Sequence, residues 1–171
     1  YIANGIFRDL TDQDYLQYVS SEQVLMSIMS GEEVDYAKLV EIIPSRPVKN
    51  HAYINQGNLT FTNDDSTGLL MPSFSNGSAY GDLDNDGDLD LVVSNVNMPS
   101  FIYENHTDKK ESGNYIQFNL KGTGKNTMAI GTQIKVYDGN SDFFLQQQPI
   151  RGFQSSMDLR PHLGLPSNSP V

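Results

Sequence analysis

The sequence predicts a mainly β protein with a small helical segment at its N-terminus. Helical periodicity is confined to residues 1–43, whereas short runs of alternating apolar and polar residues recur from Pro44 onward. Turn-forming residues separate these runs, and the 171-residue chain contains 14 Gly and 8 Pro. Together these features predict a partial β-propeller-like repeat followed by a β-sandwich-like or barrel-like module.

The first part of the helical segment contains two capping signals. Thr11 followed by Asp14, and Ser20 followed by Gln23, fit the spacing of a capping box. Four apolar residues then repeat at helical spacing: Val24, Leu25, Ile28 and Met29. Gly31 is a suitable end for this helix, because glycine readily adopts the left-handed conformation found after helix C-termini.

A second short helix is expected over Tyr36–Ile42, and Pro44 ends it. Leu39, Val40 and Ile43 form its apolar stripe. We interpret the apolar residues of both helical stretches as core packing, because such stripes normally face a protein interior.

The residues after Pro44 predict a first group of strands. Two alternating runs, around 52–54 and 59–61, are separated by "NQGN", which is typical of a β-hairpin. Another strand is expected over 89–94, and "SFIYENH" (100–106) predicts one more. This spacing favours antiparallel strands of a meander or a propeller blade.

A second group of strands is expected after the loop "TDKKESGN". Alternating residues over 116–120, 134–136 and 143–147 predict half-buried strands of a sandwich or barrel. The stretch "KGTGKNT" between them lacks the first glycine and the final Ser or Thr of a P-loop. It is therefore expected to be a turn.

Composition excludes several classes of function. Acidic residues outnumber basic ones by 21 to 11, and the net charge of -10 argues against nucleic acid and against anionic membrane surfaces as partners. The absence of cysteine excludes disulfides, thiolate metal sites and cysteine nucleophiles. No apolar stretch approaches the roughly 18 residues of a membrane span. The opening "YIANGIF" has strand composition, so we expect this sequence to be a piece of a longer chain.

The stretch "GDLDNDGDLDLVV" (81–93) predicts a metal site. Five aspartates alternate along it: Asp82, Asp84, Asp86, Asp88 and Asp90. A bound Ca²⁺, which takes six to eight oxygen ligands, would replace their mutual repulsion with attraction. Four of them fall at positions 1, 3, 5 and 9 of a loop with Gly87 at position 6, and Asp88 falls where a backbone carbonyl usually serves as ligand. Position 12 is Val93 rather than Glu, which excludes an EF-hand.

Residues 77–105 resemble an FG-GAP/VCBS repeat, the blade unit of integrin-like β-propellers. The resemblance rests on "DLDNDGDLD", on the preceding "NGSAYG", and on Tyr103 and Asn105 in "SFIYENH". It implies that the acidic loop carries calcium. The upstream stretch from Gln56 to Phe61 lacks the second glycine and the aspartate of the family pattern, so no second metal is assigned there.

Residues 114–165 resemble the ASPIC/UnbV module. The matching stretches are "YIQFNLKGTGKNTMAIGTQIKVY", "QQQPIRGFQSS" and "HLGL", with Thr132 and Leu163 departing from the family pattern. The first 21 residues resemble an insertion in Bacteroidetes-type members. The expected organisation is therefore a preceding repeat end plus helical insertion (1–43), a calcium-binding repeat (44–108) and a C-terminally truncated ASPIC/UnbV-like β domain (113–171).

These resemblances imply a non-enzymatic, calcium-binding protein that is secreted, periplasmic or on the cell surface. Its role would be adhesion or recognition of a glycan or protein ligand. No catalytic residue is assigned, since the three histidines, His51, His106 and His162, are far apart and no Gly-x-Ser-x-Gly elbow occurs.

Two alternatives remain open at this point. The chain could be an accessory region of a carbohydrate-active enzyme whose catalytic part lies outside it, or a structural spacer. A deep pocket holding two carboxylates outside residues 82–90 would favour the accessory region. Exposed aromatic residues could stack on sugars, although on strands they are more often packed. The candidates are Phe74, Tyr80, Phe101 and Phe153.

Overall fold

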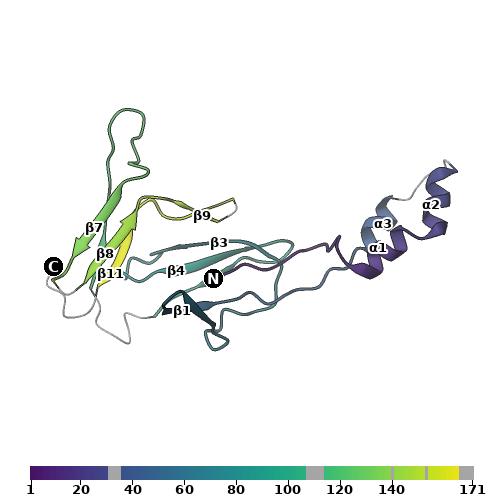
Figure 1. The fold of residues 1–171 in the computed structure, drawn as a ribbon, viewed down its shortest axis with the longest axis horizontal. Coiled ribbons are helices and arrows are strands. Elements are labelled where there is room, and N and C mark those ends of the chain that lie inside the picture. The colour runs from purple at the N-terminus through teal and green to yellow at the C-terminus, as the bar shows by residue number, and fades with distance from the viewer. Residues whose placement is uncertain (31–35, 107–113, 140, 153, 166–171) are drawn as a thin grey trace. The chain divides into compact units, whose positions relative to one another are not determined.

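The computed structural model describes residues 1–30, 36–106, 114–139, 141–152 and 154–165. Within these residues the protein is mainly β, with short helices near the N-terminus, which confirms the predicted fold class (Figure 1). The chain divides into two compact units, which are described separately. The first comprises Tyr1–Asn76 and Asn95–Met98, and the second comprises Gly77–Ser94 and Pro99–Val171. The module boundaries expected from the sequence stay a prediction.

The helices of the first unit are α1 (Gln13–Val19), α2 (Glu22–Met29) and α3 (Tyr36–Ile42). Helix α3 has the predicted bounds. The N-cap of α1 is Asp12, whose carboxylate accepts a hydrogen bond from the Tyr15 amide at 3.1 Å. The capping box predicted at Thr11 is therefore wrong by one residue. Thr11 instead donates two hydrogen bonds to the carboxylate of Asp9, so its hydroxyl is not available to cap the helix.

The second capping signal is also displaced. Ser21 is the N-cap of α2, and Ser20 is the C-cap of α1, because the two helices follow each other with almost no connecting chain. Helix α2 ends at the C-cap Ser30. The predicted helix end at Gly31 lies outside the described residues.

Helical side chains do not form a core, so the interpretation of their apolar stripes as core packing is wrong. None of the described helix residues is buried, and Leu25 and Ile28 are about half exposed. Figure 1 shows the three helices grouped together. Helices of seven or eight residues present only a narrow apolar face. Among the described residues, no sheet covers the apolar faces of these three helices. Ile43, directly after α3, is buried.

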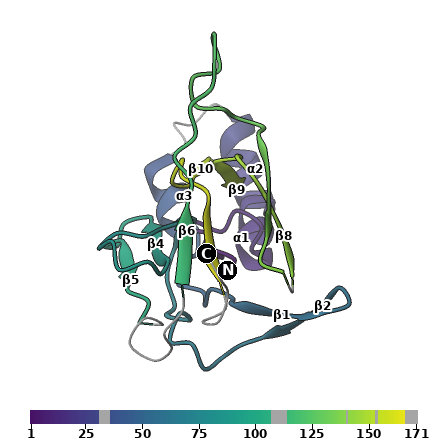
Figure 2. The same ribbon diagram turned by 90° about the vertical axis from the view of Figure 1, so that its left-hand side faces the viewer.

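The predicted hairpin is confirmed. Strands β1 (Tyr53–Gly57) and β2 (Thr60–Asn63) pair antiparallel, and Figure 2 shows the connecting turn. The two loop residues, Asn58 and Leu59, have φ angles of 49° and 61°. Positive φ at both positions is the mark of a type I′ turn, whose twist matches that of the paired strands. Leu59 therefore lies in the turn rather than in the strand where the sequence pattern placed it.

Much of the buried interior of the first unit is polar. Asn50, Ser73 and Ser75 are at most 1% exposed. The Asn50 amide donates to the Ser73 hydroxyl at 3.1 Å and to the Ser75 hydroxyl at 2.8 Å, and its oxygen accepts from the Asn4 amide at 2.8 Å. Ser75 donates its one hydroxyl hydrogen to Asn95, so Ser73 is the donor in the 2.6 Å contact between the two hydroxyls. We call these residues the Asn50 cluster.

A three-stranded sheet has the order β3 (Ser75–Gly81), β4 (Asp90–Asn95) and β5 (Phe101–Tyr103). Strands β4 and β5 confirm the predicted pair, and Val93 at its centre is fully buried. Strand β3 was not predicted, because "SNGSAYG" consists of small and polar residues without apolar alternation. Residues 82–89 form the acidic loop that joins β3 to β4.

The remaining strands of the second unit form three antiparallel pairs. β6 (Asn114–Gln117) pairs with β11 (His162–Leu165), and β7 (Gln133–Tyr137) pairs with β8 (Asp142–Gln146). β9 (Ile150–Gly152) pairs with β10 (Ser155–Ser156). The alternation predicted for β7 and β8 is confirmed by their burial patterns. β6 does not alternate, and it contains only the first two residues of the run predicted over 116–120. The stretch "KGTGKNT" is a turn as expected, with Gly124 at a φ of 64°.

Candidate metal centre

The acidic loop curls tightly because two of its residues adopt the left-handed conformation. Asn85 has a φ of 62° and Gly87 a φ of 95°. Carboxylates support the curl locally, since Asp84 accepts a hydrogen bond from the Asp86 amide at 3.3 Å and Asp86 accepts one from the Asp88 amide at 3.1 Å. This winding turns alternate side chains towards one side of the loop.

Three of the five predicted ligands come together. Asp82, Asp84 and Asp86 each offer a carboxylate oxygen, and these oxygens lie within 4.8 Å of one another. Two oxygens on opposite sides of a calcium ion, each about 2.3–2.6 Å from it, are at most about 5 Å apart. The three carboxylates therefore fit the coordination shell of one Ca²⁺.

The burial of the three carboxylates is unequal. Asp82 is 8% exposed, and its Oδ1 atom is buried without a hydrogen-bond partner. A buried carboxylate oxygen without a partner is costly, and a cation would satisfy it. Desolvation, followed by repulsion from Asp86 and Asp90, raises the pKa of Asp84 above its ordinary value. The surroundings of Asp84 therefore disfavour the charged carboxylate that an aspartate ordinarily carries at neutral pH.

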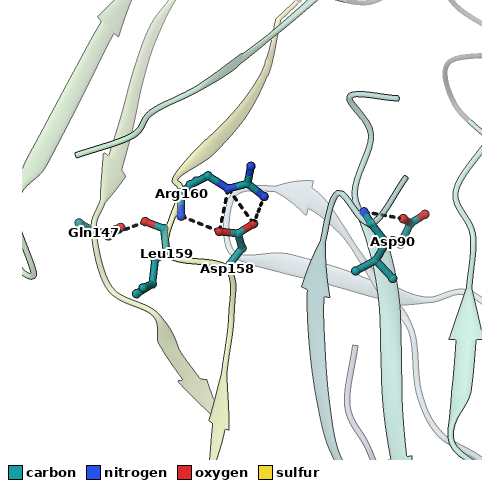
Figure 3. Close-up of polar contacts among 6 residues, drawn as sticks. Asp90, Gln147, Asp158, Leu159 and Arg160 are labelled. Atoms are coloured by element: carbon teal, nitrogen blue, oxygen red, sulfur yellow. Dashed lines mark hydrogen bonds and ion pairs between the residues drawn. The ribbon is translucent and has the colours of Figure 1, made fainter. Parts of the chain in front are cut away.

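The predicted ligand Asp90 makes other contacts, and its role as a ligand stays a prediction. It is 3% exposed and is not part of the group of three. One of its oxygens accepts from the Leu83 amide at 3.1 Å and the other from the Asn105 amide at 2.9 Å. Asp90 therefore ties the start of the loop to the chain that follows β5. Figure 3 shows one of the two hydrogen bonds of Asp90. Asp88 also lies outside the group of three, and its role as a ligand stays a prediction.

The tip of the loop rests on the strand β6. A methyl group at Gly87 would lie 2.1 Å from Cε1 of Tyr115, so no other residue fits there without displacing this ring. The Tyr115 ring in turn stacks on His162 of β11, with ring centroids 5.1 Å apart and planes inclined by 8°. Sequence reasoning found the turn role of Gly87 but missed Tyr115, because the contact joins residues far apart in the chain.

A second polar feature of this unit is the pair Asp158 and Arg160. The guanidinium Nε donates to both carboxylate oxygens at 3.1 Å, Nη2 donates to one of them, and the Arg160 amide donates at 2.9 Å (Figure 3). These hydrogen bonds lower the pKa of Asp158 and raise that of Arg160. The buried Gln147 donates to the carbonyl of Leu159 between them, which holds this segment in place. No sequence pattern predicted this pair.

The remaining candidate side chains are dispersed. His106 contacts Glu104 at 3.2 Å, and His162 stacks on Tyr115. Phe74, which directly precedes β3, packs on Phe7, and Phe101 of β5 packs on Tyr103. Tyr80 is 40% exposed, and Phe153 lies outside the described residues.

Among the described residues, no helix has both the length and the apolar character that crossing a membrane requires.

Comparison with protein families gives two matches. The model of the FG-GAP-like repeat matches residues 39–93, which include the acidic loop and most of β4. The model named ASPIC and UnbV matches residues 122–171, which include Asp158, Arg160 and His162. No curated protein and no solved structure matches the chain significantly. Residues 39–93 are therefore similar to an FG-GAP-like repeat and residues 122–171 to an ASPIC and UnbV domain, which confirms the predicted combination of the two families.

Proposed function

We propose that this protein is a calcium-binding recognition protein, in which Asp82, Asp84 and Asp86 hold one Ca²⁺. The observation that carries the proposal is the convergence of the three carboxylates within 4.8 Å, with the buried Oδ1 of Asp82 lacking a hydrogen-bond partner. Oxygen ligands alone are the donor set that calcium prefers. Magnesium fits less well, because it retains waters and requires near-octahedral geometry.

The ion would have a structural role. It would hold the acidic loop against Tyr115, while Asp90 holds the other end of the loop through Leu83 and Asn105. Loss of the ion would leave like charges crowded at the junction of β3 and β4. Binding to the folded state alone, at 100 times the dissociation constant, stabilises a protein by about 2.7 kcal/mol.

The two families support recognition as the wider role, since neither is catalytic in itself. We assign this role to the cell exterior, as adhesion to or recognition of a glycan or protein ligand. The enzyme alternative required a pocket with two carboxylates outside residues 82–90. The described cavity contains one, Asp158, whose pKa is lowered by Arg160 and which is therefore a poor general acid.

Calorimetric titration of metal-stripped protein with Ca²⁺ tests the metal site. We expect saturable heat with one ion per chain, and at least about tenfold weaker binding for Asp84→Asn, which removes a charged ligand. Asp142→Asn changes the same charge on the exposed start of β8 and should leave the titration unchanged. Absence of heat in folded, metal-free protein would refute the calcium proposal.

A further inference from the structure

The second unit contains a cavity of about 460 Å³. This volume lies within the range of roughly 300–1,000 Å³ that is typical of small-molecule sites. Its wall is formed by the end of β3, the acidic loop, the strands β6, β8, β9 and β11, and the segment 157–161. Asp82 belongs both to this wall and to the proposed metal centre.

Charged groups on the wall differ in whether they are already paired. Asp158 and Arg160 satisfy each other, as described above (Figure 3). Asp82 belongs to the group of carboxylates that would bind the cation. The side chain of Arg151 in β9 makes no hydrogen bond or ion pair within the described part of the chain. The guanidinium of Arg151 is therefore the charge on the wall that is left for a ligand, and it would pair with an anionic group.

Neutral polar groups on the wall are also available. The side-chain amides of Gln117 and Gln148 form no hydrogen bond with the described residues. Nδ1 of His162 is buried and has no partner there. An amide offers both donors and acceptors, as does a pair of neighbouring sugar hydroxyls. A ligand with several hydroxyl groups would match this set, whereas a simple inorganic anion would leave most of it unused.

Two aromatic side chains complete the wall. Tyr80 is 40% exposed and Phe144 is 58% exposed. Aromatic faces of this kind pack against apolar surfaces, including the C–H faces of sugar rings. Among the described residues, a concave site thus combines an unpaired guanidinium, free amides and exposed aromatic rings.

We propose that this cavity binds a carboxylate-bearing sugar residue, such as a hexuronate within a glycan. Arg151 would pair with the carboxylate, Gln117 and Gln148 would bind hydroxyls, and Tyr80 or Phe144 would contact the ring. The proposal rests on the recognition function proposed above and names its ligand class. Arg151 is the residue that would distinguish an acidic sugar from its neutral counterpart.

Glucuronate and glucose, titrated into the calcium-loaded 171-residue chain and followed by NMR or calorimetry, test this proposal. We expect glucuronate to bind at least about tenfold more tightly than glucose, since a charged hydrogen bond accounts for a difference of that size. The Arg151→Gln variant should abolish this preference without changing the heat of calcium binding. Lys125→Gln, which removes the same charge from the exposed "KGTGKNT" turn, should retain the preference.

Other outcomes separate this proposal from the calcium proposal. Equal binding of glucuronate and glucose, or no binding by protein that shows its calcium heat, would overturn the acidic-sugar site alone. Equal binding of N-acetylglutamate would overturn sugar recognition in favour of an acidic peptide. Glucuronate binding that depends on Arg151, in protein without calcium heat, would support the cavity and refute the metal site.

Discussion

The Asn50 cluster and the acidic loop both place polar groups in the protein interior, but they differ in how those groups are satisfied. Asn50, Ser73 and Ser75 exchange hydrogen bonds of 2.6–3.1 Å among themselves. In the acidic loop, three carboxylates converge and one buried oxygen of Asp82 has no hydrogen-bond partner. Neutral groups that donate and accept can complete one another, whereas carboxylates can only accept.

An external ligand is needed only in the second of these regions. A neutral network that is complete can stabilise the fold without any addition to the chain. A cluster of carboxylates has no internal donors for all its oxygens, so its stability depends on a cation or on protonation. The comparison therefore predicts that the first cluster is insensitive to calcium and pH, and that the second responds to both.

Asn50→Ala should destabilise the protein more than any other substitution proposed below. It removes hydrogen bonds to Ser73, Ser75 and the Asn4 amide in a fully buried place, so we expect a loss of about 3 kcal/mol in the free energy of unfolding. Urea denaturation, with and without Ca²⁺, measures it. An equal loss in both conditions is expected. The exposed Asn63→Ala is the control and should cost far less.

A smaller effect is expected for Gly87→Ala at the tip of the acidic loop. The positive φ and the displacement of Tyr115 together should cost about 2 kcal/mol. Gly131→Ala is a matched control, because its φ is 88° and no atom lies within 4 Å of the added methyl group. Urea denaturation of both variants isolates the contact with Tyr115. Equal losses would show that this contact contributes nothing.

A third prediction concerns pH in metal-free protein. The folded pKa of Asp84 is raised, so between about pH 3.9, its unfolded value, and that raised pKa the folded state binds more protons. Stability from this group is therefore present at low pH and is lost as pH rises. Asp84→Asn should be more stable than the wild type at pH 7, and this advantage should shrink as the pH is lowered towards 4.

Urea denaturation of both proteins in EGTA at several pH values measures this advantage. The Asn50→Ala difference, followed in parallel, should not vary over the same range. An Asp84→Asn advantage independent of pH would contradict the electrostatic account of the acidic loop.

The sequence was sufficient to predict the acidic loop, because its signal is local. The alternation of aspartates with Gly87 in a nine-residue stretch requires no knowledge of the rest of the fold. The hairpin β1–β2 and the strands β4 and β5 were predictable for the same reason, since alternation and turn residues lie close together.

Long-range contacts could not be predicted. The partners of Asp90 include Asn105, 15 residues away, so its role in tying the loop could not be read from spacing. Tyr115 stacks on His162 because the strands β6 and β11 pair. The place of Arg151 on the cavity wall also depends on how the strands of the second unit pair. The helices were predicted to pack in a core and do not. Apolar periodicity leads to burial only where another element covers the apolar stripe.

The calcium site is best tested by the change in unfolding free energy between EGTA and excess Ca²⁺, measured for the wild type and Asp84→Asn. We predict that calcium, at 100 times its dissociation constant, stabilises the wild type by about 2.7 kcal/mol. Asp84→Asn should gain much less, although it starts from a higher stability in EGTA. Equal gains in both proteins, or none in the wild type, would contradict the assignment of Asp82, Asp84 and Asp86 as the calcium ligands.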